Sequence, residues 1–279
     1  MDVPLNNQVF FPATFGELFS VWGKFPDAVP FAGGTDIMQY QGRRVPCLPH
    51  NLLYLDKLAD LRRITRTERY LELGAMVTLN EIIYLGKVVP EVFIRCLEGI
   101  AGPQVRNIAT IGGNLCHKGW RLDTFAPLLG LDALYELRNA AFARWIAASR
   151  FASMPESLAL NERELLTRIR IPLEPWDYSA YKKFKRQETG ESSGCAIFLV
   201  RSEKNALTGL RVVFAGGVIL RDKNSESLLI GKRLPLDEKD AAGFIERWNT
   251  YLDGVGNTDA LFRSSLLKFI GSCLDVLVM

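Results

Sequence analysis

The sequence contains few of the residues that bind metals or form disulfides. Among its 279 residues are five cysteines and two histidines. The cysteines form no Cys-x-x-Cys pair, the spacing common among zinc and iron–sulfur ligands; they stand at positions 47, 96, 116, 195 and 273. His50 and His117 are too far apart in the chain for a local metal site. We therefore expect buried free thiols and no metal.

The chain also lacks a long apolar run and an excess of one charge. Its longest apolar stretch, VVFAGGVIL from Val212, is far too short to span a bilayer. The opening MDVPLNNQVFF has no basic segment followed by an apolar core, so it does not resemble a secretory signal. The 34 Lys and Arg nearly balance the 31 Asp and Glu, without a run of five like charges. We expect a cytoplasmic protein with no membrane span and no nucleic-acid partner.

Short helices and strands alternate through the first two thirds of the chain. Thr14 and Glu17 have the form of a capping box before a helical spacing of apolar residues, and Thr78 and Glu81 form a second one. Another helix is expected from Glu91 to Ala101. Strands are expected in VPFAGG, NLLYL, RYLELG, DALYELR and LLTRIRIP, with a helix over FAPLLG.

The last third has a different pattern. Two β-rich runs, 194–200 and 210–220, flank the polar turn SEKNALTG and predict a hairpin. Residues 237–252 are helical in composition. One face of a final helix carries the apolar side chains Phe262, Leu266, Phe269, Ile270, Cys273, Leu274 and Leu277.

Two Gly-Gly turns carry the strongest chemical signal. Gly33-Gly34-Thr35 and Thr110-Ile111-Gly112-Gly113-Asn114 each follow a β-like run. Glycine lets successive backbone N–H groups converge on an anion, and a neighbouring hydroxyl or amide adds a donor. Neither turn has the Rossmann or the P-loop spacing. Each could be a plain turn, but together they could bind a pyrophosphate from two sides.

The order of these motifs resembles a known family. AGGTD, LGAMVTLNEI, GPQVRNIATIGGNL, LLTRIRIP, SAYKKF, RVVFAGGV and FRSSLLKFIGSCL follow one another as in the FAD-binding medium subunits of molybdenum hydroxylases, of the xanthine dehydrogenase and carbon monoxide dehydrogenase type. The likeness covers nearly the whole chain, and the TIGGN block with its PQVRN lead is its most specific part.

The resemblance implies a fold and partners. The fold is α+β: FAD-binding subdomains of the PCMH or vanillyl-alcohol-oxidase type at residues 1–55 and 56–174, then a C-terminal carbon monoxide dehydrogenase flavoprotein-like domain at 175–279. In such complexes a molybdopterin-containing large subunit oxidises the substrate and a 2Fe-2S small subunit relays electrons. The flavin subunit then passes them to NAD or another acceptor.

The resemblance also implies which residues contact FAD. Two loops would bind the pyrophosphate, Ile100 would pack beside the flavin, Asp123 would accept hydrogen bonds from hydroxyls, Leu166 would supply an apolar contact and Lys182 would favour reduced flavin. The first loop comprises Phe31, Ala32, Gly33, Gly34, Thr35, Asp36 and Ile37, and the second Thr110, Ile111, Gly112, Gly113 and Asn114.

Structural alternatives exist for several of these residues. Asp36 and Asp123 could each cap a following helix, and Lys182 could belong to a solvated basic face. The apolar contact at Leu166 could shift by one position to Thr167. A chemical role for Cys116 or His117 has little support beyond their place after the second loop.

Two segments depart from the family pattern, and two rival functions stay open. LCHKGWRL (115–122) and the stretch 186–194 differ from the usual family sequence. Whether these segments still support FAD binding, and which electron acceptor docks beside them, is therefore open. One rival is a free-standing FAD-dependent reductase or oxidase of the same two-loop fold. The other is an assembly subunit that has lost its cofactor.

Overall fold

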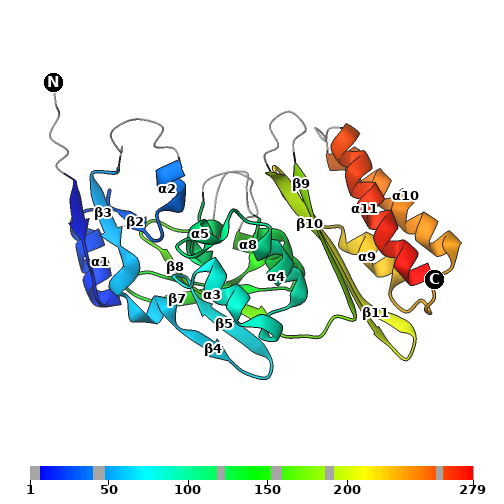
Figure 1. Ribbon diagram of the computed structural model, residues 1–279, viewed down its shortest axis with the longest axis horizontal. Coiled ribbons are helices and arrows are strands. Elements are labelled where there is room, and N and C mark those ends of the chain that lie inside the picture. Colours follow the sequence, from blue (N-terminus) through cyan, green and yellow to red (C-terminus); the bar gives the residue numbers. More distant parts are fainter. Residues whose placement is uncertain are drawn as a thin grey trace.

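The computed structural model describes residues 7–39, 48–117, 123–151, 159–185, 192–255 and 260–278. Three β-sheets follow one another along the long axis of the molecule, with the first sheet near the N-terminus and the third beside the C-terminal helices (Figure 1). The mixture of sheets and helices confirms the expected α+β class.

The first unit is a parallel sheet of three strands in the order β1-β3-β2. Its elements are β1 (Gln8–Phe10), α1 (Phe15–Lys24), β2 (Val29–Phe31), α2 (Thr35–Gln39) and β3 (Asn51–Tyr54). Helix α1 begins as predicted, where the Thr14 side chain accepts the N–H of Glu17. The Glu17 carboxylate accepts the N–H of Ala13 instead of that of Thr14, so the predicted capping box is only half formed.

The second unit is an antiparallel sheet of five strands in the order β4-β5-β8-β6-β7. The strands are β4 (Ile64–Arg66), β5 (Tyr70–Gly74), β6 (Leu134–Arg138), β7 (Ala143–Ala147) and β8 (Leu165–Pro172). The helices are α3 (Leu79–Tyr84), α4 (Glu91–Glu98), α5 (Pro103–Arg106), α6 (Ile111–Leu115), α7 (Phe125–Gly130) and α8 (Ala148–Phe151), with short 3-10 helices at Leu55–Lys57, Ala59–Arg62 and Gly86–Val88.

Local signals located most of these elements correctly. The capping box of α3 is complete, because Thr78 accepts the N–H of Glu81 and the Glu81 carboxylate accepts the N–H of Thr78. Helix α4 ends at Glu98 instead of Ala101, because Ala101 has a left-handed backbone with φ 46°. A residue with positive φ cannot continue a right-handed helix, whose φ is about −63°.

The third unit is an antiparallel sheet of four strands in the order β12-β11-β10-β9. Its elements are β9 (Tyr178–Lys185), β10 (Ser192–Glu203), β11 (Ala206–Gly216), β12 (Ile219–Leu220), α9 (Lys223–Leu229), α10 (Glu238–Val255) and α11 (Ala260–Val278). The predicted hairpin is present, but its turn is only Lys204-Asn205, with φ 49° and 59°. Positive φ at both positions matches the twist of the flanking strands, so β10 and β11 extend into the polar segment. The expected run 210–220 is divided, because the chain turns back after Gly216 to form β12.

The third sheet is covered on both faces. Helices α4 and α7 pack on one face, and α9, α10 and α11 lie on the other (Figure 1). On β10, Cys195, Ile197 and Leu199 join the core shared with the first two units, whereas Ala196, Phe198 and Val200 join a second core under α10 and α11. A strand buried on both faces needs a continuous apolar run, which explains CAIFLV. The predicted apolar face of α11 lies in the second core.

Candidate functional site

The first glycine turn joins β2 to α2. Gly34 has φ 68°, a left-handed conformation that favours glycine, and a Cβ atom there would lie 2.5 Å from the Phe31 ring. Among the described residues, no acceptor is found for the backbone N–H groups of Gly33 to Asp36. These donors at the start of α2 are available to an anionic ligand.

The second glycine turn uses its donors within the protein. We expected this turn to follow a strand. Instead it comes after helix α5 and forms the start of helix α6. Ile111 donates to the Val77 carbonyl (3.0 Å), Gly112 to the Ala75 carbonyl (2.9 Å) and Asn114 to the Thr110 carbonyl (2.9 Å). Gly113 donates to the Thr110 hydroxyl. The expectation that these amides converge on an anion is therefore not met in this conformation.

Gly112 serves close packing instead. A Cβ atom on it would lie 2.7 Å from both the carbonyl oxygen and the Cβ atom of Ala75. Real Cβ atoms do not approach backbone oxygen so closely, so glycine lets α6 rest against the chain after β5.

The two turns nevertheless meet. A Cβ atom on Gly33 would lie 1.8 Å from the carbonyl oxygen of Ile108, just before the second turn. Beyond that turn, His117 Nδ1 lies 3.0 Å from the Asp36 carboxylate, an ion pair when the ring is protonated. The first and second units are therefore in contact at the two glycine turns.

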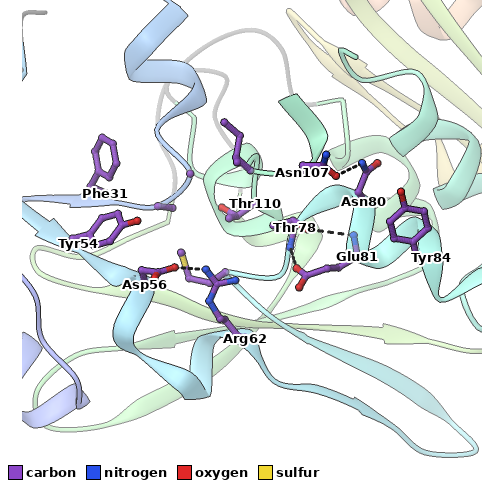
Figure 2. Close-up of a pocket in the computed structure, with 14 residues that line it drawn as sticks. Phe31, Tyr54, Asp56, Arg62, Thr78, Asn80, Glu81, Tyr84, Asn107 and Thr110 are labelled. Carbon is purple, nitrogen blue, oxygen red and sulfur yellow. Dashed lines mark hydrogen bonds and ion pairs between the residues drawn. The ribbon is translucent and has the colours of Figure 1, made fainter. Parts of the chain in front are cut away.

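A cavity of about 440 Å³ opens between the first and second units (Figure 2). It is lined by Phe31, Ala32, Gly33, Tyr54, Asp56, Arg62, Met76, Thr78, Asn80, Glu81, Tyr84, Asn107, Ile108 and Thr110. In Figure 2, Phe31 and Tyr54 lie on one side, and Asn80, Asn107 and Tyr84 lie on the other. Of the predicted residues, Phe31, Ala32, Gly33 and Thr110 line it.

Sequence reasoning did not identify the other lining residues as part of a site. Thr78 and Glu81 were noted only as a capping box. Asp56 and Arg62 form an ion pair between two short 3-10 helices, where the sequence shows no motif. Tyr84 ends α3 and is 79% exposed, so its apolar ring faces solvent at the cavity edge.

A polar network fixes the far wall of the cavity. Asn80 is buried, and its amide donates to the Asn107 side chain (2.6 Å) and to the Pro103 carbonyl (3.1 Å). Arg106 Nε donates to the Asn80 oxygen at 3.2 Å. The PQVRN segment is thus tied to α3, and Ile100 lies beside it, because its carbonyl accepts from Arg106.

Comparison with known proteins identifies the family. Residues 5–174 match the family described as FAD binding domain in molybdopterin dehydrogenase. The chain belongs to this family. The xanthine dehydrogenase FAD-binding subunit of Escherichia coli O157:H7 is 29% identical over 72% of this chain and 71% of that protein. The carbon monoxide dehydrogenase medium chain of Hydrogenophaga pseudoflava is 28% identical over 86% of this chain and 85% of that protein.

Solved structures agree with the fold of this FAD-binding family. A Cu,Mo-CO dehydrogenase structure matches with a TM-score of 0.78 and 25% identity, covering 98% of this chain and 96% of that chain. Quinoline 2-oxidoreductase from Pseudomonas putida 86 matches with a TM-score of 0.80 and 22% identity, covering 100% and 97%. The expected fold, an FAD-binding domain followed by a C-terminal domain, is confirmed.

The donors and acceptors at the cavity suit FAD, the cofactor of this family. The backbone N–H groups of Gly33 to Asp36, for which the described part of the chain offers no acceptor, are the kind of donor that a pyrophosphate needs. Asp56 and Glu81 supply carboxylates, which accept from hydroxyl and amino groups and repel phosphate. A volume of about 440 Å³ falls within the ~300–1,000 Å³ of small-molecule sites.

The two predicted aspartates have partners other than helix caps. Helix α2 begins at Thr35, so Asp36 lies in its first turn and not at the N-cap. Thr124, not Asp123, is the N-cap of α7, so the capping alternative for Asp123 is wrong. Asp123 is 8% exposed and lies 3.6 Å from Lys183 Nζ.

Lys182 lies away from Asp123. Its side chain is exposed and stands over the Phe184 ring, 5.5 Å from the centroid. Phe184 belongs to the core under α10 and α11, whereas Tyr181 packs on the opposite face of β9. Because side chains alternate along a strand, Lys183 is the lysine that faces the FAD-binding units. The expectation that Lys182 lies near the flavin ring stays a prediction, while Lys183 is the lysine that lies beside Asp123.

Leu166 is buried and Asn114 is partly buried near the second turn. Leu166 lies in β8 and is 3% exposed, while Thr167 donates to Glu136 (2.6 Å) and its carbonyl accepts from Ala75. The Asn114 side chain accepts a hydrogen bond from Thr124 (2.6 Å). These contacts give Leu166 and Asn114 defined positions between α6, α7 and β8.

The thiol after the second turn is not activated. Burial raises the pKa of Cys116 to about 12, so the thiol stays protonated at neutral pH and is a poor nucleophile. Within the described residues, no group of three or more His, Cys, Asp or Glu side chains could hold a metal. Residues 118–122 and 186–191, which hold most of the departures from the family pattern, lie outside the described residues.

Proposed function

We propose that this chain carries FAD as the electron-transfer subunit of a molybdenum hydroxylase complex. It would accept electrons from a 2Fe-2S small subunit that is itself reduced by a molybdopterin-containing large subunit, and would pass them to NAD or another acceptor. The observation that carries the proposal is the family match over residues 5–174 together with the cavity at the two glycine turns. The relatives described as a medium chain and as an FAD-binding subunit support the assignment to a complex.

We assign the cofactor contacts by their chemistry. In the first loop, Phe31 to Ile37, the backbone N–H groups of Gly33 to Asp36 supply donors to the pyrophosphate, and in the second loop, Thr110 to Asn114, Thr110 lines the cavity. Ile100, Asp123 and Leu166 contribute the apolar and carboxylate contacts expected from the family. Bound FAD supplies two-electron acceptance from one-electron donors.

The chain divides into three functional units under this proposal. Residues 1–55 and 56–174 form the two FAD-binding subdomains, and residues 175–279 form the C-terminal domain. The separate sheets support these boundaries, because β3 ends at Tyr54, β8 at Pro172 and β9 begins at Tyr178.

Purification and FAD titration test the proposal. The purified chain should be yellow, release FAD on denaturation and, once stripped, quench the fluorescence of added FAD to one equivalent. Reconstitution with the two partner subunits should let substrate reduce the flavin, and NAD and an artificial dye offered separately identify the acceptor. Protein that takes up no FAD yet assembles with its partners would support the assembly-subunit alternative. Turnover of a substrate by the isolated chain would support a free-standing reductase or oxidase.

A further inference from the structure

Two contacts hold the first glycine turn against the segment that carries the second. Before the second turn, the Ile108 carbonyl packs on Gly33, where a Cβ atom would lie 1.8 Å from its oxygen. Beyond the second turn, His117 Nδ1 lies 3.0 Å from the Asp36 carboxylate. Gly33 and Asp36 are the two ends of the stretch whose backbone N–H groups find no acceptor among the described residues. Each end of that stretch is therefore held by the second unit.

The contact at His117 depends on the charge of its ring. The side chain is 17% exposed, and its Nδ1 atom is buried without a hydrogen-bond partner among the described residues. Because no hydrogen bond forms, the attraction to Asp36 is electrostatic and needs the positive charge of a protonated imidazole. A neutral ring would leave a buried nitrogen without a partner, which is unfavourable. The first loop is therefore held by His117 only while the ring carries a proton.

The charged side chains of the strand beside α6 have partners of their own. Strand β8 packs against α6, and its Arg168 and Arg170 pair with Glu136 and Glu72. On α2, Asp36 is the residue that pairs with the ring. Within the described part of the chain, the charge balance of this contact therefore involves His117 and Asp36 alone.

Two further titratable groups lie near the end of α6. Burial raises the pKa of Cys116 to about 12, and burial also raises the pKa of Tyr135, which lies near that thiol, above its ordinary value of 10. Both side chains stay neutral between about pH 5 and pH 8, the range in which histidine side chains gain and lose a proton. A change of charge beside Asp36 in this range therefore comes from His117.

We propose that His117 is a positioning residue whose protonated ring holds the first FAD loop against the second, so that the protein binds FAD more tightly at lower pH. The inference rests on the proposed function, because it takes the two glycine turns as the FAD loops. The positive ring also offsets the Asp36 carboxylate, which otherwise repels a pyrophosphate bound by the same loop. When the ring loses its proton, the loop is released and the carboxylate is no longer offset, so both effects weaken FAD binding.

The test compares the two histidines of the chain. Fluorescence titration of the stripped protein should show FAD affinity falling about fivefold from about pH 5.5 to about pH 8.5, a loss that a half-exposed ion pair can supply. His117→Asn should bind FAD at every pH as weakly as wild type does at the upper pH. His50→Asn is the matched control, because His50 is exposed and does not line the cavity, and its pH profile should equal that of wild type.

Two more variants separate the charge of the ring from its shape and from direct contact with FAD. His117→Lys keeps a positive charge over the whole range, so its affinity should not change with pH and should exceed that of His117→Asn at the upper pH. Asp36→Asn removes the partner of the ring, so its affinity should also be independent of pH. Thermal melting shows that each variant is folded.

Several results would overturn the proposal. They are a flat profile in wild type, a profile in His117→Asn as steep as that of wild type, and a lysine variant that binds no more tightly than the asparagine variant. A pH dependence that persists in Asp36→Asn would show that the histidine acts on FAD directly and not by holding the loop. Wild-type protein that binds no FAD at any pH would overturn the proposed function and this inference with it.

Discussion

At the scale of single residues, glycines decide whether the first and second units can approach each other. Gly33 has no room for a Cβ atom, because the Ile108 carbonyl would lie 1.8 Å from it. The obstacle is backbone, which cannot move aside as the end of a flexible side chain can. Gly33 therefore controls both the contact between the units and the cavity that it lines.

Replacing Gly33 with alanine should separate the two turns and weaken FAD binding by at least about tenfold, since the loop must shift to remove the clash. Fluorescence titration with FAD measures the loss. Gly243→Ala is the control, because its added Cβ in helix α10 would meet nothing within 4 Å apart from the adjacent backbone of the helix itself. That change should leave FAD affinity unaltered and stabilise the helix by up to about 1 kcal/mol. Unchanged affinity in Gly33→Ala would refute the role given to this contact.

At the scale of elements, a buried carboxylate ties the edge strand β7 to the turn before β8. Glu164 is 4% exposed, and both of its oxygens accept from the Arg144 guanidinium at 2.7 Å. Asn161 N–H donates to the same carboxylate (2.9 Å). The hydrogen bonds from Arg144 lower the pKa of Glu164 below its ordinary value of 4.5.

This carboxylate should make stability depend on acid pH. Because its pKa is lower in the folded protein, its contribution is complete above pH 4.5 and is lost as the pH falls through the folded-state pKa. Glu164→Gln should therefore be less stable than wild type at pH 7, and the difference should shrink below pH 4.5. Urea unfolding at several pH values measures the difference in the free energy of unfolding between the variant and wild type. Glu162→Gln serves as the control, since that side chain is 79% exposed.

A difference between Glu164→Gln and wild type that stays constant over the whole pH range would contradict this role of Glu164.

At the scale of the whole molecule, several charged contacts among the described residues join the C-terminal domain to the FAD-binding units. Lys183 lies beside Asp123, and Arg201 pairs with Glu174. A further contact is made by Asp132, in the turn after α7, whose oxygens lie 3.1 Å from both Arg211 of β11 and Arg221 beyond β12. Arg221 is largely buried and also pairs with Glu226, so this network belongs to the junction between domains and not to an open surface.

Asp132→Asn should weaken the junction between the domains. Asparagine tolerates the left-handed backbone of this position (φ 53°), so the variant removes charge without adding strain. We expect a loss of about 1 kcal/mol, because Asp132 itself is half exposed, and a smaller loss in about 1 M salt. Thermal melting at low and high salt measures both. Asp60→Asn removes an exposed ion pair with Arg63 and should change the melting temperature little. An equal loss of stability in Asp60→Asn would mean that the contact at Asp132 contributes no more than an ordinary surface ion pair.

Much of the fold could be predicted from local patterns. The Thr14 and Thr78 caps, the alternation of LLTRIRIP and the apolar face of α11 each involve residues close together in the chain. Such signals depend on hydrogen bonds and periodicity within one element, so the sequence is sufficient to find them. The order of the glycine motifs likewise predicted the family that the comparison confirms.

The site itself depended on contacts that no local pattern contains. Local patterns were sufficient for many of the helices and strands and for the positions of the two glycine turns in the chain. The contacts between units were needed to show that, among the described residues, the N–H groups of the first turn have no acceptor, that those of the second donate to Val77 and Ala75, and that Lys183 lies beside Asp123. Whether an N–H group has an acceptor depends on which segments pack against it, and those segments can be distant in the chain. Which of two neighbouring side chains faces a site depends on the orientation of the strand, because adjacent residues of a strand lie on opposite faces.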